Sequence, residues 1–200
     1  MTKPSLADDV DYLRELAESG ATGAPSGGKY FLVWAVVVTV GLILTYAAVT
    51  KSLPLAPDQL NYVWAAVLAA GWVASFLMGS TDGARPESAR FANRLTSAMW
   101  IAAGIGLTAI WAGLAISGVA SQALMMPIAA AVSGVATVAS AIIFRIRWLY
   151  AIAVAWWIVA FASFFLLDRI EFILFSAAAI LLLQGGTGLA LVLAERRRTA

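Results

Sequence analysis

Residues 30–50 read YFLVWAVVVTVGLILTYAAVT, an uncharged and mostly apolar stretch that decides the fold class. A helix rises about 1.5 Å per residue, so about 20 such residues cross the ~30 Å hydrocarbon core of a bilayer. Five further stretches of similar length follow, each without an Asp, Glu, Lys or Arg in its interior. The predicted spans are 30–50, 61–79, 97–117, 123–144, 148–167 and 172–194. The sequence therefore predicts an all-α polytopic membrane protein, a bundle of six transmembrane helices.

The composition agrees with this class and excludes several kinds of chemistry. The chain is 62% apolar and 12% charged, whereas a soluble domain is about 45–50% apolar and about 25% charged. It contains neither Cys nor His, which excludes disulfides, zinc–thiolate sites and a histidine general base. The carboxylates Asp168 and Glu171 flank Arg169 in a short connection and are expected to mark the membrane boundary. We therefore expect no catalytic residue, metal or cofactor, and no enzyme.

The basic residues predict the orientation of the bundle. Loops rich in Lys and Arg stay in the cytoplasm. Only Lys51 and Arg169 fall on the predicted outer side. The predicted inner side holds the other basic residues: Lys3, Arg14, Lys29, Arg85, Arg90, Arg94, Arg145, Arg147, Arg196, Arg197 and Arg198. Both termini are therefore expected in the cytoplasm, and the short outer connections predict three helical hairpins.

The N-terminal region, residues 1–28, is predicted to be a cytoplasmic helix followed by a flexible Gly-rich linker. It precedes the transmembrane domain, residues 29–195, and the chain closes on a basic tail, residues 196–200. Within residues 5–19 an apolar stripe recurs at helical spacing. The stripe consists of Leu6, Val10, Leu13 and Ala17. We predict that these four side chains bind a partner.

The charge of this predicted helix argues against a role on the lipid surface. Five carboxylates stand against Lys3 and Arg14 in residues 1–28, which gives a net charge of −3. The cytoplasmic leaflet is anionic and attracts basic helices. Three outcomes stay open: docking into the groove of a partner protein, docking onto the arginines of the inner face, or disorder.

Small residues recur every fourth position on three of the predicted spans. Such stripes let helix backbones approach closely in lipid. They consist of Gly71, Ser75 and Gly79; Gly104, Thr108 and Ala112; and Ala129, Ser133, Thr137 and Ala141. We interpret Gly104, Thr108, Ser133 and Thr137 as helix-packing residues, and a homodimer seam or a narrow pathway is the alternative. Several tryptophans, including Trp34, Trp64 and Trp100, lie near span ends and are expected to anchor the protein at the membrane interface.

The last predicted span contains the most polar intramembrane stretch, Gln184, Gly185, Gly186, Thr187 and Gly188. Each glycine weakens a helix by about 1 kcal/mol relative to Ala, and an interrupted helix can offer its carbonyl groups to a solute. One hypothesis is therefore a solute pathway through these residues. The other is that Gln184 hydrogen-bonds a neighbouring helix and the glycines allow close packing.

The two ends of the chain resemble those of small uncharacterised bacterial inner-membrane proteins with six spans. The matching residues are Asp8, Asp9, Tyr12, Leu13, Arg14, Leu16, Ala17 and Glu18, then Gly27 and Gly28, and finally Arg196, Arg197 and Arg198. The resemblance implies a multi-pass protein of the bacterial inner membrane. It implies no activity and no site residue.

The function predicted from the sequence is a non-enzymatic scaffold or regulator that docks a partner at the cytoplasmic face through its N-terminal helix. That partner is a cytoplasmic or membrane protein, and homo-oligomers stay open. No pattern of a nucleic-acid-binding module is present. The alternative is a transporter or channel for a small neutral or weakly polar solute, since intramembrane charge, the usual mark of ion pathways, is missing from the spans.

Overall fold

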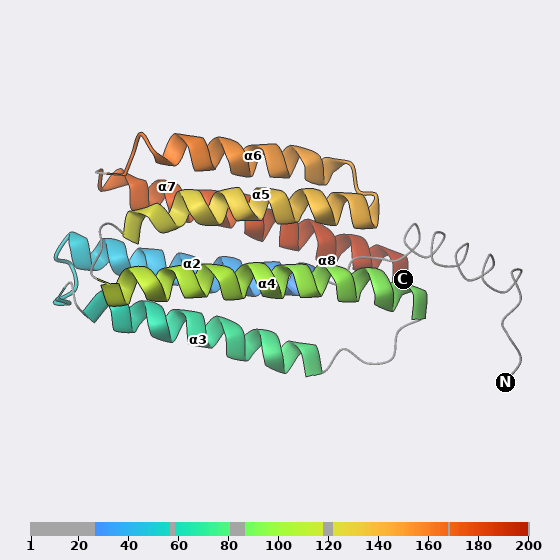
Figure 1. Ribbon diagram of the computed structural model, residues 1–200, viewed down its shortest axis with the longest axis horizontal. Helices are drawn as coiled ribbons and strands as arrows, with labels where there is room; N and C mark the ends of the chain where they lie inside the picture. Colours follow the sequence, from blue (N-terminus) through green and yellow to red (C-terminus); the bar gives the residue numbers. More distant parts are fainter. Residues whose placement is uncertain (1–26, 57–58, 81–86, 118–121, 168, 200) are drawn as a thin grey trace, which may run out of the picture.

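The computed structural model describes residues 27–56, 59–80, 87–117, 122–167 and 169–199 (Figure 1). The predicted N-terminal helix, with Leu6, Val10, Leu13 and Ala17, lies outside these residues. All regular secondary structure in the described residues is helical, which confirms the all-α prediction. The helices are α2 (Gly28–Val49), α3 (Gln59–Ser80), α4 (Glu87–Ser117), η1 (Gln122–Leu124), α5 (Met125–Phe144), α6 (Trp148–Ser163), α7 (Glu171–Ala179), η2 (Ile180–Gly185) and α8 (Gly186–Thr199).

Five helical segments are long and apolar enough to cross a membrane. They are Gly28–Val49, Gln59–Gly79, Ala92–Ser117, Met125–Phe144 and Glu171–Arg197, the last of which joins α7, η2 and α8. The sixth apolar helix, α6, has 16 residues and is about 24 Å long at 1.5 Å per residue. The described chain is therefore a multi-pass helical protein with five helices of spanning length and one shorter apolar helix.

Helix α4 begins earlier than the sequence analysis expected. The sequence placed residues 80–96 between two predicted spans, but α4 starts at Glu87, ten residues before the predicted span 97–117. The prediction was wrong because residues 87–96 contain no Gly or Pro, so nothing ends the helix where the apolar stretch does.

The helices lie side by side along the long axis of the molecule and alternate in direction (Figure 1). One end holds the start of α2, the end of α3, the start of α4, the α5–α6 turn and the end of α8; the other end holds the α2–α3, α4–α5 and α6–α7 connections. The first end carries the basic residues Lys29, Arg145, Arg147, Arg196 and Arg197, and the second carries Lys51 and Arg169. The fold therefore places the basic residues of the described chain mainly at one end.

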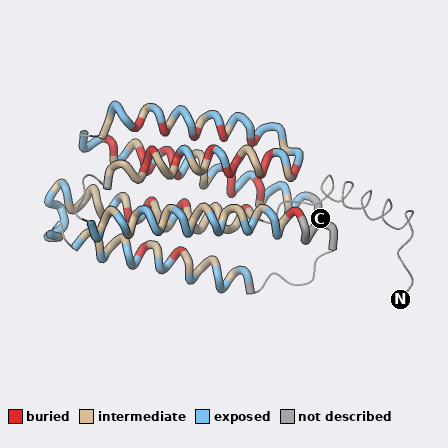
Figure 2. Tube along the Cα trace, in the orientation of Figure 1, coloured by how far each residue is buried: buried red, intermediate tan, exposed pale blue. Residues whose placement is uncertain are grey.

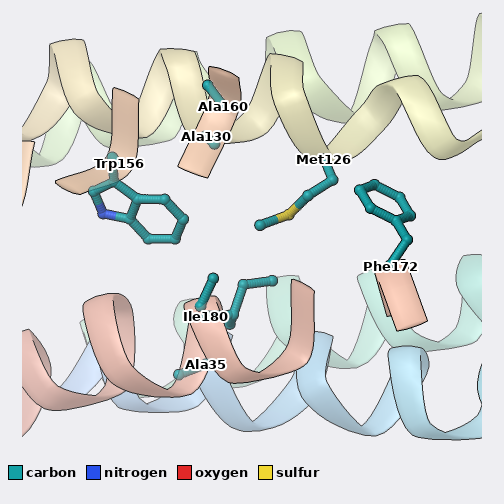
Figure 3. Packing of buried hydrophobic residues seen from close by; sticks show 8 residues of the cluster. Ala35, Met126, Ala130, Trp156, Ala160, Phe172 and Ile180 are labelled. Atoms are coloured by element: carbon teal, nitrogen blue, oxygen red, sulfur yellow. The ribbon is translucent and has the colours of Figure 1, made fainter. Parts of the chain in front are cut away.

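Burial is uneven across the bundle. Figure 2 shows buried residues concentrated on α5, α6 and the last span, with few on α3 and α4. Figure 3 shows the main apolar cluster, in which side chains of α5 and α6 face those of α2 and the last span. The cluster consists of Ala35, Met126, Ala130, Trp156, Ala160, Phe172, Ala179 and Ile180. Outward-facing side chains such as Phe76, Ile116 and Phe161 are large and apolar, as a lipid-exposed surface requires.

Candidate functional site

A tryptophan of one helix lies against a glycine of the next helix. The indole N–H group of this tryptophan donates to a hydroxyl that lies one turn beyond the glycine. At Gly71 of α3, an added methyl group would lie 2.9 Å from the Trp34 ring of α2. The Trp34 Nε1 group donates a hydrogen bond to Ser75 Oγ at 3.0 Å. The missing Cβ makes room for the indole, and the Ser75 hydroxyl gives the partly buried N–H group of Trp34 a hydrogen-bond partner.

The same arrangement recurs between the neighbouring helices. The ring of Trp64 lies against Gly41, and its Nε1 donates to Thr45 Oγ1 at 3.1 Å. The ring of Trp72 lies against Gly104, and its Nε1 donates to Thr108 Oγ1 at 3.4 Å. We call these three arrangements the tryptophan–hydroxyl contacts. Two of them join α2 and α3, one with its tryptophan on α2 and one with its tryptophan on α3. The third joins α3 to α4.

The contact between α4 and α5 is a variation on this arrangement. Trp100 Nε1 of α4 donates to Ser140 Oγ of α5 at 3.1 Å. The Trp100 ring also packs edge to face on Phe31 of α2, with ring centroids 4.8 Å apart. The indoles of Trp34, Trp64 and Trp100 therefore bond within the bundle, a role that their positions near span ends did not indicate.

The structure places the predicted packing residues at contacts within the chain. Gly104 and Thr108 lie against Trp72. Thr137 is buried and donates a hydrogen bond to the backbone oxygen of Ser133 at 2.6 Å. How much these residues contribute to stability stays a prediction that only substitutions test.

The last span runs through the predicted polar stretch without a break but changes its winding there. Ile180–Gly185 form a π-helix, in which the N–H group of Gly186 donates to the backbone oxygen of Leu181. Single π turns inside α-helices occur frequently at functional sites. The sequence pointed to a weak place in this helix through its glycines, but apolar periodicity carries no signal for a π turn.

The glycines of this stretch have different surroundings. A methyl group at Gly188 would lie 2.8 Å from the backbone oxygen of Gly28 and 2.9 Å from the backbone nitrogen of Leu32. At Gly185 the nearest such atom is the Cβ of Ala35, at 3.4 Å, and at Gly186 no atom lies within 4 Å. Gly28 and Gly188 therefore allow the backbones of α2 and α8 to touch, whereas Gly186 has no close neighbour.

Two buried hydroxyl groups near this crossing lack a partner. Thr187 is 2% exposed and Thr39 is 6% exposed, and neither hydroxyl has a hydrogen-bond partner in the part of the chain that the structure describes. Gln184 is partly buried, and no hydrogen bond joins its amide to another described residue. A buried polar group without a partner is costly and calls for an explanation.

A groove between α4 and α5 has a volume of about 310 Å³. It is lined by Met99, Ala103, Ala131, Val132, Val135 and Ala136. This apolar lining does not include Gln184, so the groove is not a polar pathway. No group of three or more His, Cys, Asp or Glu residues able to hold a metal ion occurs in the described residues.

The basic end of the bundle is where the N-terminal region joins the helices. Gly28 lies against Val192, which is one helical turn before Arg196. Lys29 Nζ donates to the backbone oxygen of Met78 at 3.3 Å and so ties the start of α2 to the end of α3. The described chain therefore begins beside the end of α8 that carries Arg196 and Arg197.

Comparison with known proteins identifies no relative of this chain. No protein-family model matches the chain, and neither a curated protein nor a solved structure matches it. The residues and their geometry therefore carry the functional argument.

Proposed function

We propose that this protein is a non-enzymatic scaffold or regulator of the bacterial inner membrane, which docks a protein partner at its cytoplasmic face through the N-terminal helix. In this proposal the helix uses Leu6, Val10, Leu13 and Ala17 for docking. The observation that supports it most is the place where the acidic N-terminal region joins the bundle, beside the basic end of α8. This end is the cytoplasmic face of the proposal.

The proposal includes six membrane crossings, with both termini in the cytoplasm. Beyond α6 the chain continues in tight turns, with Phe164 N donating to Phe161 O at 3.2 Å and Leu166 N to Ser163 O at 3.1 Å. The apolar stretch from Trp148 to Leu167, of which α6 is the regular part, has about the number of residues that a crossing needs, and this supports the proposal. Short connections rich in basic residues remain inside, which makes the basic end the cytoplasmic one.

Charge supports a docking platform at this end. The N-terminal region carries a net charge of −3, and the described basic end carries Lys29, Arg145, Arg147, Arg196 and Arg197 against Glu195. Attraction between the two holds the acidic side of the helix near the bundle. Its apolar stripe is then available to a partner.

The test is capture of a stoichiometric partner from membranes solubilised in gentle detergent. The full-length protein is compared with a version lacking residues 1–28 and with the triple variant Leu6→Ser, Val10→Ser and Leu13→Ser. We expect both changes to abolish capture, because a helix docks into a groove through its apolar face. Tyr12→Ser, which lies outside the stripe on the same helix, is the matched control and should retain the partner. Capture that survives the triple variant would refute the docking role.

The second candidate is a transporter or channel for a small neutral or weakly polar solute. The observation that favours it is the π-helix in the last span, which contains Gln184, an amide with no hydrogen bond to another residue in the part of the chain that the structure describes. The test is solute uptake into proteoliposomes by the protein and by Gln184→Leu. Uptake that is unchanged in the variant would remove the role assigned to Gln184.

A further inference from the structure

The crossing of α2 with the last span contains polar side chains that the helix packing leaves without partners. Three contacts define how the two helices pass: Gly28 against Val192, Gly28 against Gly188, and Ala35 against Gly185. Residue numbers rise on one helix as they fall on the other, so the helices are antiparallel here. Thr187 is adjacent to Gly188, and Thr39 lies one helical turn beyond Ala35.

Gln184 lies between the two hydroxyl groups along this crossing. At 1.5 Å per residue the levels of Thr187 and Thr39 differ by roughly 9 Å, and Gln184 is roughly midway between them. The glutamine side chain is long enough to reach several ångströms along the helix. One amide and two hydroxyls therefore fall within about 9 Å of each other along the axis of this crossing.

The two hydroxyls differ from three buried hydroxyls elsewhere in the bundle, although Thr96 Oγ1 of α4 also lacks a partner among the described residues. The hydroxyls of Thr137, Ser163 and Ser176 donate to the backbone oxygen four residues earlier, at 2.6, 2.7 and 2.7 Å. Those of Thr39 and Thr187 make no such bond, although both residues are more than nine-tenths buried. Both groups can therefore donate and accept hydrogen bonds with a molecule held at the crossing.

We propose that this crossing binds the hydroxyl group of a small uncharged molecule, either water or a small polyol, through Thr39, Gln184 and Thr187. Buried waters typically make about three hydrogen bonds to otherwise unsatisfied groups. The three residues are uncharged, and a neutral ligand is the class that such a set accepts. The site does not depend on docking through the N-terminal helix, so the partner-capture experiment and the tests below succeed or fail separately.

The first test is the sign of the change in melting temperature on Thr187→Val and Thr39→Val. If a bound hydroxyl satisfies these groups, each valine removes a real hydrogen bond and lowers the melting temperature. If the groups are truly without a partner, each valine relieves a buried polar group and raises it. Ser163→Ala, at a buried hydroxyl bonded within its own helix, is the matched control for the cost of changing a core position.

The second test uses thiol reactivity, because the native chain contains no cysteine. Thr187→Cys and Thr39→Cys are treated in proteoliposomes with a small water-soluble methanethiosulfonate and compared with Ser163→Cys. The thiolate is the reactive form, and apolar burial suppresses it. At a hydrated site we expect reaction about tenfold faster or more than at the dry control, since one unit of thiol pKa is a tenfold change in thiolate.

Labelling in the presence of glycerol distinguishes a site that binds a polyol from a site that binds water. Slower labelling of Thr187→Cys in glycerol, with an unchanged rate in an exposed Leu53→Cys variant, assigns the site to a polyol. Labelling that glycerol leaves unchanged assigns it to water. Rates at positions 39 and 187 no faster than at position 163, together with valine variants that melt higher than the parent, would overturn the proposal.

Discussion

At the scale of single residues, the bundle is specified by tryptophans that fit against glycines. The spacing of the small residues Gly71, Ser75, Gly104 and Thr108 in the sequence indicates close helix packing. The sequence does not indicate that Trp34 and Trp72 are their partners. A spacing pattern shows which face of a helix is small, but it contains no information about which side chain of another helix fills the space.

We predict that Gly71→Ala destabilises the protein by about 1–3 kcal/mol, the usual cost of overpacking a tight contact. The added methyl group would lie 2.9 Å from the Trp34 ring and would push the indole away from Ser75. Gly79→Ala on the same helix is the control, because its nearest neighbour, Tyr30 Oη, is at 3.5 Å. The measurement is reversible unfolding in detergent. Equal stability of the two variants would show that the Trp34 contact does not constrain this position.

A second residue-scale prediction concerns Arg145, which ends α5 with a φ of 54°. This left-handed conformation costs a residue other than glycine roughly 1–2 kcal/mol, whereas glycine adopts it freely. We expect Arg145→Gly to raise the stability of the α5–α6 hairpin by about 0.5–1 kcal/mol, because glycine loses part of this gain through its greater freedom in the unfolded chain. Arg145→Ala, measured in the same unfolding experiment, removes the charge but keeps the strain. A variant Arg145→Gly no more stable than Arg145→Ala would mean that the backbone at this turn is unstrained.

At the scale of helices, the last span shows what apolar pattern can and cannot predict. Its position and length were predictable, since residues 172–194 are apolar and the helix covers them. The π turn at Ile180–Gly185 was not predictable, because the apolar pattern of a segment carries no signal for the winding of its helix. The early start of α4 was not predictable either. Hydrophobicity marks the part of a helix that lies in the membrane, and a helix can continue beyond that part.

We predict that Gly188→Ala weakens the packing of α8 on α2, whereas Gly186→Ala does not. The methyl group at position 188 would meet backbone atoms of Gly28 and Leu32 within 3 Å, and backbone atoms cannot move aside as a side chain does. At position 186 the space is open, and alanine should favour the helix by up to about 1 kcal/mol. The melting temperatures of the two variants, only two residues apart, are the measurement. The reverse order would show that this crossing is not set by glycine contacts.

At the scale of the whole molecule, the fold separates the chain into a basic end and an end with few charges. The sequence predicted this separation from loop charges alone, and the helix directions place Arg145, Arg147 and Arg196 at the same end. Five helices have the length and composition of a span. The count of six depends on α6, whose regular part is short and whose last residues continue in tighter turns.

The orientation has a consequence for function. If α6 crosses, both ends of the chain lie on the same side of the membrane as the basic end of the bundle, which is the arrangement that the proposed docking requires. If it does not cross, the C-terminal arginines lie on the opposite side of the membrane from the N-terminal region. The docking platform that we propose would then not exist.

The most direct test is therefore the side of the membrane on which each connection lies. Ile146→Cys, Ile170→Cys and Ala200→Cys are made singly in the cysteine-free chain and treated in intact cells with a membrane-impermeant maleimide; all basic residues stay in place. Leu53→Cys, in the α2–α3 connection, is the control for an outside position. We predict labelling of positions 53 and 170 in intact cells, and of positions 146 and 200 only after the membrane is permeabilised. Labelling of positions 146 and 170 from the same side would contradict the six-span bundle and the cytoplasmic docking face that rests on it.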